Sequence, residues 1–273
     1  MDFIGYIILL LIGGCISGLL TGLLGVGGGT VLSPLQYYLL LSIGVNPDIA
    51  LTMAFATSLG VLVVTFFNAT KENYRNEIIE FRYLKELIAF GFTGALIGSI
   101  INVNSDTTLV SGIFGVFCIL SAVNMIFAKS QETDANICGS RLSYILLGSI
   151  VGILSGLLGV GGAALMIPAL TVIFKYPTHK AIGTSSAVIL IVSIGGLIAY
   201  IIQGLHVSGL PEYSFGYLNI IQFIVLTITS SIVVTYSARL SAKTDGKILK
   251  ICQILLIGFM GIIMLIRPIS VIF

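Results

Sequence analysis

The sequence is dominated by eight apolar runs that are each long enough to cross a lipid bilayer. A membrane-spanning α-helix needs about 20 apolar residues, because the hydrocarbon core cannot satisfy unpaired backbone groups. Only 9% of the 273 residues are charged, too few to give a water-soluble fold a polar surface. We therefore expect an all-α polytopic membrane protein. Its full crossings should lie near residues 3–24, 49–68, 84–101, 107–128, 142–160, 181–204, 216–238 and 248–266.

Two further apolar stretches, 30–43 and 163–174, are too short to span a membrane unaided. Each follows a glycine cluster directly. We expect them to be half-helices or re-entrant segments that add to the eight crossings.

An internal repeat divides the chain in two. Residues 14–34 and 148–168 align without gaps and share 12 of 21 positions, including the sequence GLLGVGG and the proline that follows it. Further along, AFATS at 54–58 matches AIGTS at 181–185. We therefore divide the chain into a first transmembrane repeat (1–128), a cytoplasmic linker (129–141) and a second transmembrane repeat (142–273).

Basic residues predict the orientation, because Lys and Arg collect in cytoplasmic loops. Four loops hold 12 of the 13 basic residues and can all face one side if each short segment forms a hairpin with the helix before it. Both termini then lie on the non-cytoplasmic side, and the two repeats have inverted topology, as in many secondary transporters. These basic residues are Lys71, Arg75, Arg82 and Lys85; Lys129 and Arg141; Lys175 and Lys180; and Arg239, Lys243, Lys247 and Lys250.

The two glycine clusters are candidate substrate-binding sites. A helix interrupted at membrane depth frees backbone N–H groups, and half-helix dipoles there can bind an anion that glycine allows to approach closely. The substrate-binding glycines predicted on this basis are Gly27, Gly28, Gly29, Gly161 and Gly162. The regularly spaced glycines upstream, from Gly14 and from Gly148, are instead expected to let helices pack closely.

The repeated hydroxyl pairs Thr57-Ser58 and Thr184-Ser185 lie near the starts of long apolar helices. They could cap these helices or donate hydrogen bonds to an anion. If they are ligands, the two motifs should converge on one central site. The amide side chains within the apolar segments are expected to bond between helices, Gln36, Asn219 and Gln222 among them.

Several classes of site are excluded by the residues. The basic residues are too few and too scattered for nucleic-acid binding. Neither the four cysteines nor His179 and His206 have the spacing of a metal site, and no catalytic set of side chains clusters. GVGGAA at 159–164 resembles a dinucleotide motif but lacks the acidic residue that should follow it. We expect no cofactor, no metal and no enzymatic activity.

Three features together resemble the TauE/SafE sulfite exporter family of membrane anion transporters: the doubled GLLGVGG with its proline, the doubled AxxTS, and GLP at 209–211 followed by GYLN at 216–219. The resemblance covers essentially the whole chain. It implies transport of a small sulfur-containing or organic anion, such as sulfite or a sulfonate, across the bacterial plasma membrane. The sequence departs from the family at Ala56, where glycine is common, and in its charged first cytoplasmic loop.

The sequence favours a secondary transporter whose partners are a small anion and the lipid bilayer, in a chain that could also form homo-oligomers. Two alternatives stay open. One is a permease subunit that needs an energising partner, and the other, less favoured, is a membrane-embedded enzyme. No Asp, Glu, Lys or Arg lies deep within an apolar run, so the sequence does not locate a coupling site.

Overall fold

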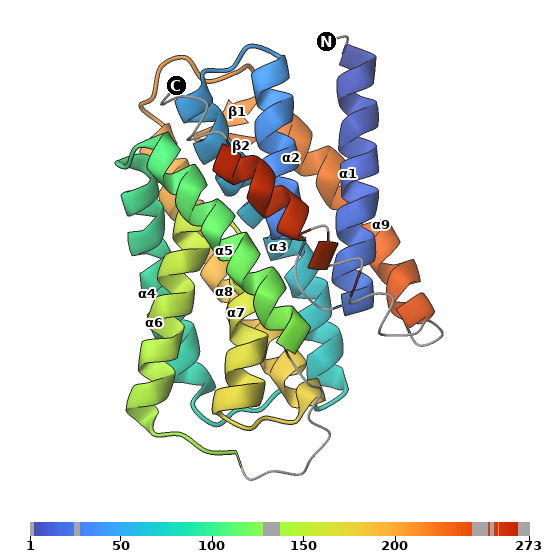
Figure 1. Ribbon diagram of the computed structural model, residues 1–273, viewed down its shortest axis with the longest axis vertical. Coiled ribbons are helices and arrows are strands. Elements are labelled where there is room, and N and C mark those ends of the chain that lie inside the picture. The colour runs from blue at the N-terminus through green and yellow to red at the C-terminus, as the bar shows by residue number, and fades with distance from the viewer. Residues whose placement is uncertain are drawn as a thin grey trace.

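The computed structural model describes residues 3–24, 28–127, 137–241, 251, 254–255 and 257–266, which form an elongated helical bundle (Figure 1). Its helices are α1 (Phe3–Leu24), α2 (Gly29–Ser42), α3 (Pro47–Arg75), α4 (Leu84–Val103), α5 (Thr107–Phe127), α6 (Arg141–Leu158), α7 (Ala163–Pro168), the π-helix η1 (Ala169–Ile173), α8 (Thr178–Gly204) and α9 (Ile220–Ser241). A further helix covers Ile257–Ile266. The strands β1 (Ser214–Phe215) and β2 (Leu218–Asn219), which were not expected, form a short antiparallel hairpin.

The observed helices lie on the predicted apolar runs. Among the described residues, α3, α4, α6 and α8 are long and apolar enough to cross a membrane, and α1, α5 and α9 contain shorter apolar stretches. The two short runs are separate pieces, α2 and the continuous pair α7 and η1. Pro168 stands at the change from α7 to η1, where its missing N–H disfavours a regular α-helix.

Long helices from the two halves pack against each other. The central helices α3 and α8 contact along their length, while α1 packs on α9 and α6 on α4. Thus the first helix of each predicted repeat packs on the helix that follows the central helix of the other. In Figure 1, α1 runs downward from Phe3 and α6 runs upward from Arg141.

The upstream glycines lie at these contacts, as predicted. A Cβ built at Gly18 would approach the backbone of Ser230 in α9 to 2.7 Å, and one at Gly148 would approach the Leu87 carbonyl of α4 to 2.9 Å. Gly152 and Gly156 meet the backbone of α4 more closely still. Small residues therefore set the helix separation on both sides of the bundle.

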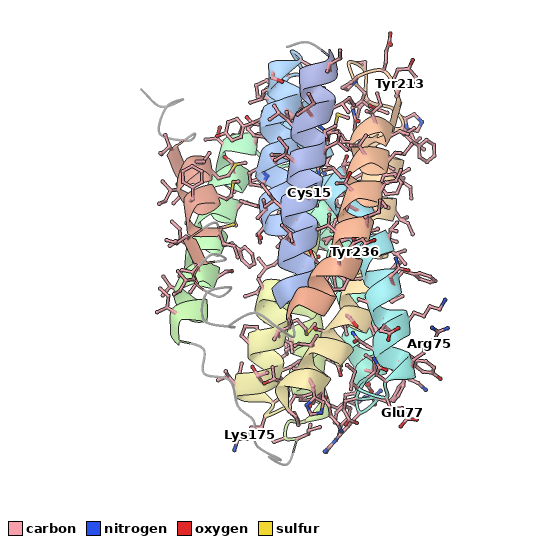
Figure 2. All side chains as sticks on the ribbon, turned by 90° about the vertical axis from the view of Figure 1, so that its right-hand side faces the viewer. Cys15, Arg75, Glu77, Lys175, Tyr213 and Tyr236 are labelled. Atoms are coloured by element: carbon pink, nitrogen blue, oxygen red, sulfur yellow. The ribbon has the colours of Figure 1, made fainter. Side chains whose placement is uncertain are left out.

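The charged segments gather at one end of the bundle. Figure 2 shows Arg75, Glu77 and Lys175 at this end and Tyr213 at the opposite end. Ion pairs connect Lys180 to Glu80 and Arg141 to Glu86, each at 2.8–2.9 Å. The described basic residues of the first three loops therefore lie together, as expected. Most of the fourth loop, and most of the predicted linker 129–141, falls outside the described residues.

Candidate functional site

The two glycine clusters meet inside the bundle. A Cβ added to Gly29, at the start of α2, would lie 3.0 Å from both the Cα and the carbonyl oxygen of Val160. Val160 belongs to the segment between α6 and α7. The starts of the two short helices are therefore neighbours, and the structure brings the predicted glycines Gly28, Gly29, Gly161 and Gly162 into one region. Gly27 lies outside the described residues.

The second cluster has a backbone that favours glycine. Gly159, Gly161 and Gly162 have φ angles of +63°, +75° and +76°, values that side-chain-bearing residues rarely adopt. In contrast, Gly28 has an ordinary φ of −64°. A positive φ is therefore required in the second cluster but not at Gly28.

Free backbone donors surround this turn. Gly159 N–H donates to the Ser155 carbonyl, but the N–H groups of Gly161 and Gly162 make no hydrogen bond to any described residue. Successive N–H groups at such a turn form a concave site for an anion. The segment therefore offers donors that the surrounding protein leaves unused.

Two buried hydroxyls add to these donors. Ser155 of α6 and Ser193 of α8 are 1% and 0% exposed, and their Oγ atoms have no hydrogen-bond partner within the described part of the chain. A Cβ built at Gly162 would lie 3.6 Å from Ser155 Cβ, and one built at Gly161 would lie 3.6 Å from Ser193 Oγ. Both hydroxyls were missed as candidate ligands.

A signal for Ser155 is present in the sequence, because Ser155 aligns with Thr21 in the repeat. Thr21 Oγ1 accepts a 3.0 Å hydrogen bond from Gly28 N, seven residues away. The equivalent hydroxyl in the second repeat is unpartnered. The two halves are thus alike in sequence here but differ in the hydroxyl that is free to bind a ligand. Ser193 has no counterpart hydroxyl, since Phe66 occupies the equivalent position.

The first hydroxyl pair contacts the other half of the chain. Thr57 Oγ1 accepts a 3.0 Å hydrogen bond from the backbone N–H of Asn219, just before α9. Ser58 Oγ accepts hydrogen bonds from Ser33 Oγ at 2.9 Å and Gln36 Nε2 at 3.3 Å. Gln36 therefore bonds between helices, as predicted, and Thr57 ties α3 to the start of α9.

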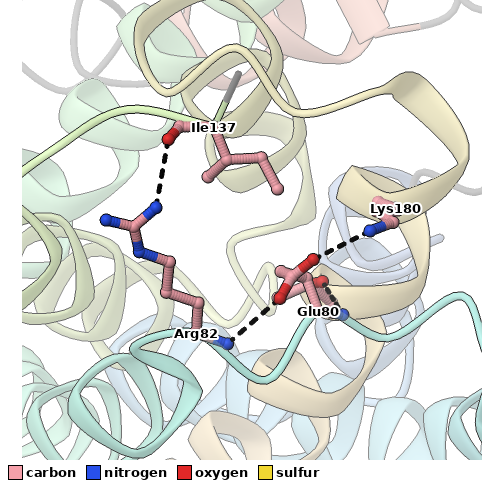
Figure 3. Close-up of polar contacts among 5 residues, drawn as sticks. Glu80, Arg82, Ile137 and Lys180 are labelled. Atoms are coloured by element: carbon pink, nitrogen blue, oxygen red, sulfur yellow. Dashed lines mark hydrogen bonds and ion pairs between the residues drawn. The ribbon is translucent and has the colours of Figure 1, made fainter. Parts of the chain in front are cut away.

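The second hydroxyl pair lies at the charged end of the bundle. Thr184 Oγ1 accepts from the backbone N–H of Glu80 at 3.0 Å, and Ser185 Oγ donates to the Ile182 carbonyl. The Glu80 carboxylate bonds to Lys180, and neighbouring Arg82 donates to the Ile137 carbonyl (Figure 3). The hydrogen bond from Lys180 is the main cause that lowers the pKa of Glu80 below its ordinary value.

The expectation that the two hydroxyl motifs converge is wrong. Asn73 of α3 donates a hydrogen bond to Ser186 of α8, next to the second motif. The second motif therefore lies beside the part of α3 around Asn73. Thr57 lies 16 residues before Asn73, about 24 Å along the helix at 1.5 Å per residue. The two pairs therefore belong to different sites. Whether any of the four hydroxyls contacts an anion stays a prediction.

This architecture defines a polytopic membrane protein with two interrupted helices that meet in its interior. The comparisons with known proteins identify the group: a model described as sulfite exporter TauE/SafE matches residues 10–264. The chain belongs to this family.

Relatives match over most of their length. The chain is 33% identical to a probable membrane transporter protein, MJ0441, of Methanocaldococcus jannaschii, over 97% of both chains. It is 27% identical to a probable membrane transporter protein of Haemophilus influenzae, over 90% of this chain and 92% of the relative. It is 29% identical to the probable membrane transporter protein YunE of Bacillus subtilis, over 74% and 81%. No solved structure matches the chain. The chain is a membrane transporter of the sulfite exporter type.

Proposed function

We propose that this protein is a secondary transporter of small anions, with sulfite, sulfonates and related sulfur-containing or organic anions as its substrate class. The observation that carries this proposal is the meeting of the two glycine clusters, where backbone N–H groups lie beside the unpartnered hydroxyls of Ser155 and Ser193. These groups are donors without a fixed positive charge. They suit an anion that must be bound and then released.

The packing of the two halves supports alternating access between inverted repeats. Helices α1 and α6 run in opposite directions, and each packs on a helix of the other half, α1 on α9 and α6 on α4. This arrangement fits two copies related by a twofold axis in the membrane plane. In this proposal the chain crosses the membrane eight times, and α2 and the α7–η1 pair are re-entrant. The charged end of the bundle faces the cytoplasm, and both termini face the opposite side of the plasma membrane.

Reconstitution tests this function. Purified protein in liposomes, with no ATPase added, should take up ³⁵S-labelled sulfite with saturation and should exchange it against unlabelled sulfite inside. Protein-free liposomes are the baseline. Gly258→Ala is a matched control, because among the described residues a Cβ there would meet only Ala122, at 4.0 Å. Uptake that appears only with an added ATPase would favour a permease subunit, and chemical conversion of the sulfite would favour an enzyme.

A further inference from the structure

Two fully buried glutamines lie apart from the glycine clusters. Gln36 of α2 and Gln222 of α9 are both 0% exposed. Gln222 Nε2 donates to the Tyr6 hydroxyl at 2.8 Å, and Gln36 Nε2 donates to Ser58 Oγ. The amide nitrogens are thus used, while the two amide oxygens have no hydrogen-bond partner in the described part of the chain. A buried acceptor without a donor is energetically unfavourable, so these two oxygens are candidate ligand-binding atoms.

The Gln222 side chain, from the second half of the chain, reaches the backbone of α2 in the first half. Gln222 Nε2 also contacts the backbone carbonyl of Gln36 at 3.5 Å. The Asn219 side-chain oxygen accepts from Gln222 N and caps the start of α9. We call the group of Tyr6, Ser33, Gln36, Ser58 and Gln222 the glutamine cluster.

The chemistry of the glutamine cluster favours a cation over an anion. Its free atoms are amide oxygens, which repel an anion and attract positive charge. All its members are neutral, and a site for Ca²⁺ or Mg²⁺ ordinarily includes carboxylates. Neutral oxygens in a protein interior instead suit a singly charged hard cation, as in transporters that bind Na⁺ beside interrupted helices.

We propose that the glutamine cluster binds a monovalent alkali cation through the amide oxygens of Gln36 and Gln222. Binding of the cation to the glutamine cluster does not depend on the proposed function. A role of the cation in coupling to anion transport rests on that function.

Helix α2 connects this site to the glycine clusters. Ser33 and Gln36 follow Gly29 by four and seven residues and share its face of the helix. Gln36 thus lies about 10 Å along the axis from Gly29. At that separation, and at an effective dielectric constant near 20, a bound cation should strengthen anion binding about tenfold. The anion must strengthen cation binding by the same factor.

Direct binding of ²²Na⁺ to the full chain in detergent tests the site, with choline gluconate maintaining ionic strength. We expect saturable binding that unlabelled Na⁺ displaces and choline does not, with K⁺ competition showing which alkali ion the site prefers. Gln222→Leu and Gln36→Leu should each lower the affinity at least tenfold. Gln203→Leu in α8 is the matched control, because the Gln203 amide bonds only within its own helix.

Gln222→Glu covers the case in which a leucine variant does not fold. A carboxylate at this position should raise cation affinity, whereas a purely structural amide would give no gain. The proposal is overturned if the wild-type chain binds no alkali cation with saturation, or if binding persists unchanged in a folded Gln222→Leu protein. A chain that transports anions without binding the cation contradicts this site alone. A chain that binds the cation but transports no anion contradicts the proposed function alone.

Discussion

Lys180 Nζ lies 2.9 Å from Glu80 Oε2, and this ion pair joins the first turn of α8 to the segment between α3 and α4. The same segment donates the Glu80 N–H to Thr184. One residue of the first half is therefore held by two residues of α8.

Acidification should weaken this contact. Because Lys180 lowers the pKa of Glu80 below its ordinary 4.5, the ionised carboxylate stabilises the fold above pH 4.5. This stabilisation is lost as pH falls through the lowered pKa. We expect Glu80→Gln to flatten the acid-side decline in melting temperature between about pH 5 and pH 3. The loss near neutral pH should be at most about 1 kcal/mol, since Lys180 is partly exposed. Glu77→Gln, at the same end but outside the ion pair, should keep the wild-type profile.

The two glycine clusters should differ in their tolerance of a methyl group. Gly162→Ala should abolish anion transport, because φ is +76° and the new Cβ would lie 2.5 Å from Val151 Cγ1. Gly28→Ala should retain more activity, because its φ is −64°, although the new Cβ would crowd Ser17, with the Ser17 Cβ 2.9 Å and its Cα 3.2 Å away. Transport rates, normalised to inserted protein, measure both. Equal activity in the two variants would contradict the difference in backbone requirement.

Removing an unpartnered hydroxyl should affect binding and not folding. A hydrogen bond to a charged group contributes about 1.5–3 kcal/mol, so Ser155→Ala or Ser193→Ala should raise the anion dissociation constant roughly 10- to 100-fold. Melting temperature should not fall, since neither Oγ has a partner among the described residues. Ser99→Ala is the contrast. Its Oγ contacts three backbone carbonyls, and its loss should lower stability by about 1 kcal/mol with little change in affinity.

The repeated threonines should behave as structural acceptors. Thr57→Val leaves the buried Asn219 N–H unpaired and should reduce the free energy of unfolding by about 1–3 kcal/mol. Thr184→Val should reduce it less, because Glu80 is only partly buried and water can replace the acceptor. Denaturation of both variants tests this ranking. An anion dissociation constant that rises tenfold with unchanged stability would instead favour the ligand interpretation.

Cys138 provides a probe of orientation. It is exposed at the charged end, next to the Ile137 carbonyl that Arg82 contacts. In a chain with Cys15, Cys118 and Cys252 replaced by alanine, an impermeant thiol reagent should label Cys138 in inside-out vesicles and not in right-side-out ones. The opposite labelling would reverse the proposed orientation.

The helices and the glycine breaks were predictable because their signals are local. A run of apolar residues favours a membrane helix, and a glycine cluster before a proline favours a break in it. Both effects depend on residues close in the sequence and not on what packs against them. The contact between Gly29 and Val160, and the approach of Ser193 to Gly161, depend on how distant helices pack. Nothing in a single sequence specifies these distances.

The error over the hydroxyl motifs has a geometric cause. In an antiparallel pair such as α3 and α8, equivalent positions meet only near the pair's midpoint. Thr57 and Thr184 both lie closer to the starts of their helices, which are at opposite ends of the bundle. The repeated threonines therefore have similar contacts, each accepting an N–H from the other half, although they lie in different places.

The packing of α1 on α9 also constrains the order in which the protein can mature. Helix α1 leaves the ribosome long before its partner α9, which begins only at Ile220. Until then, the face that carries Gly14 and Gly18 has no α9 to contact. In contrast, α4 and α6 are close in the chain and can pair early during synthesis. Biogenesis should therefore proceed from the α4–α6 side of the bundle, with α1 remaining at the translocon or in the lipid until α9 is inserted.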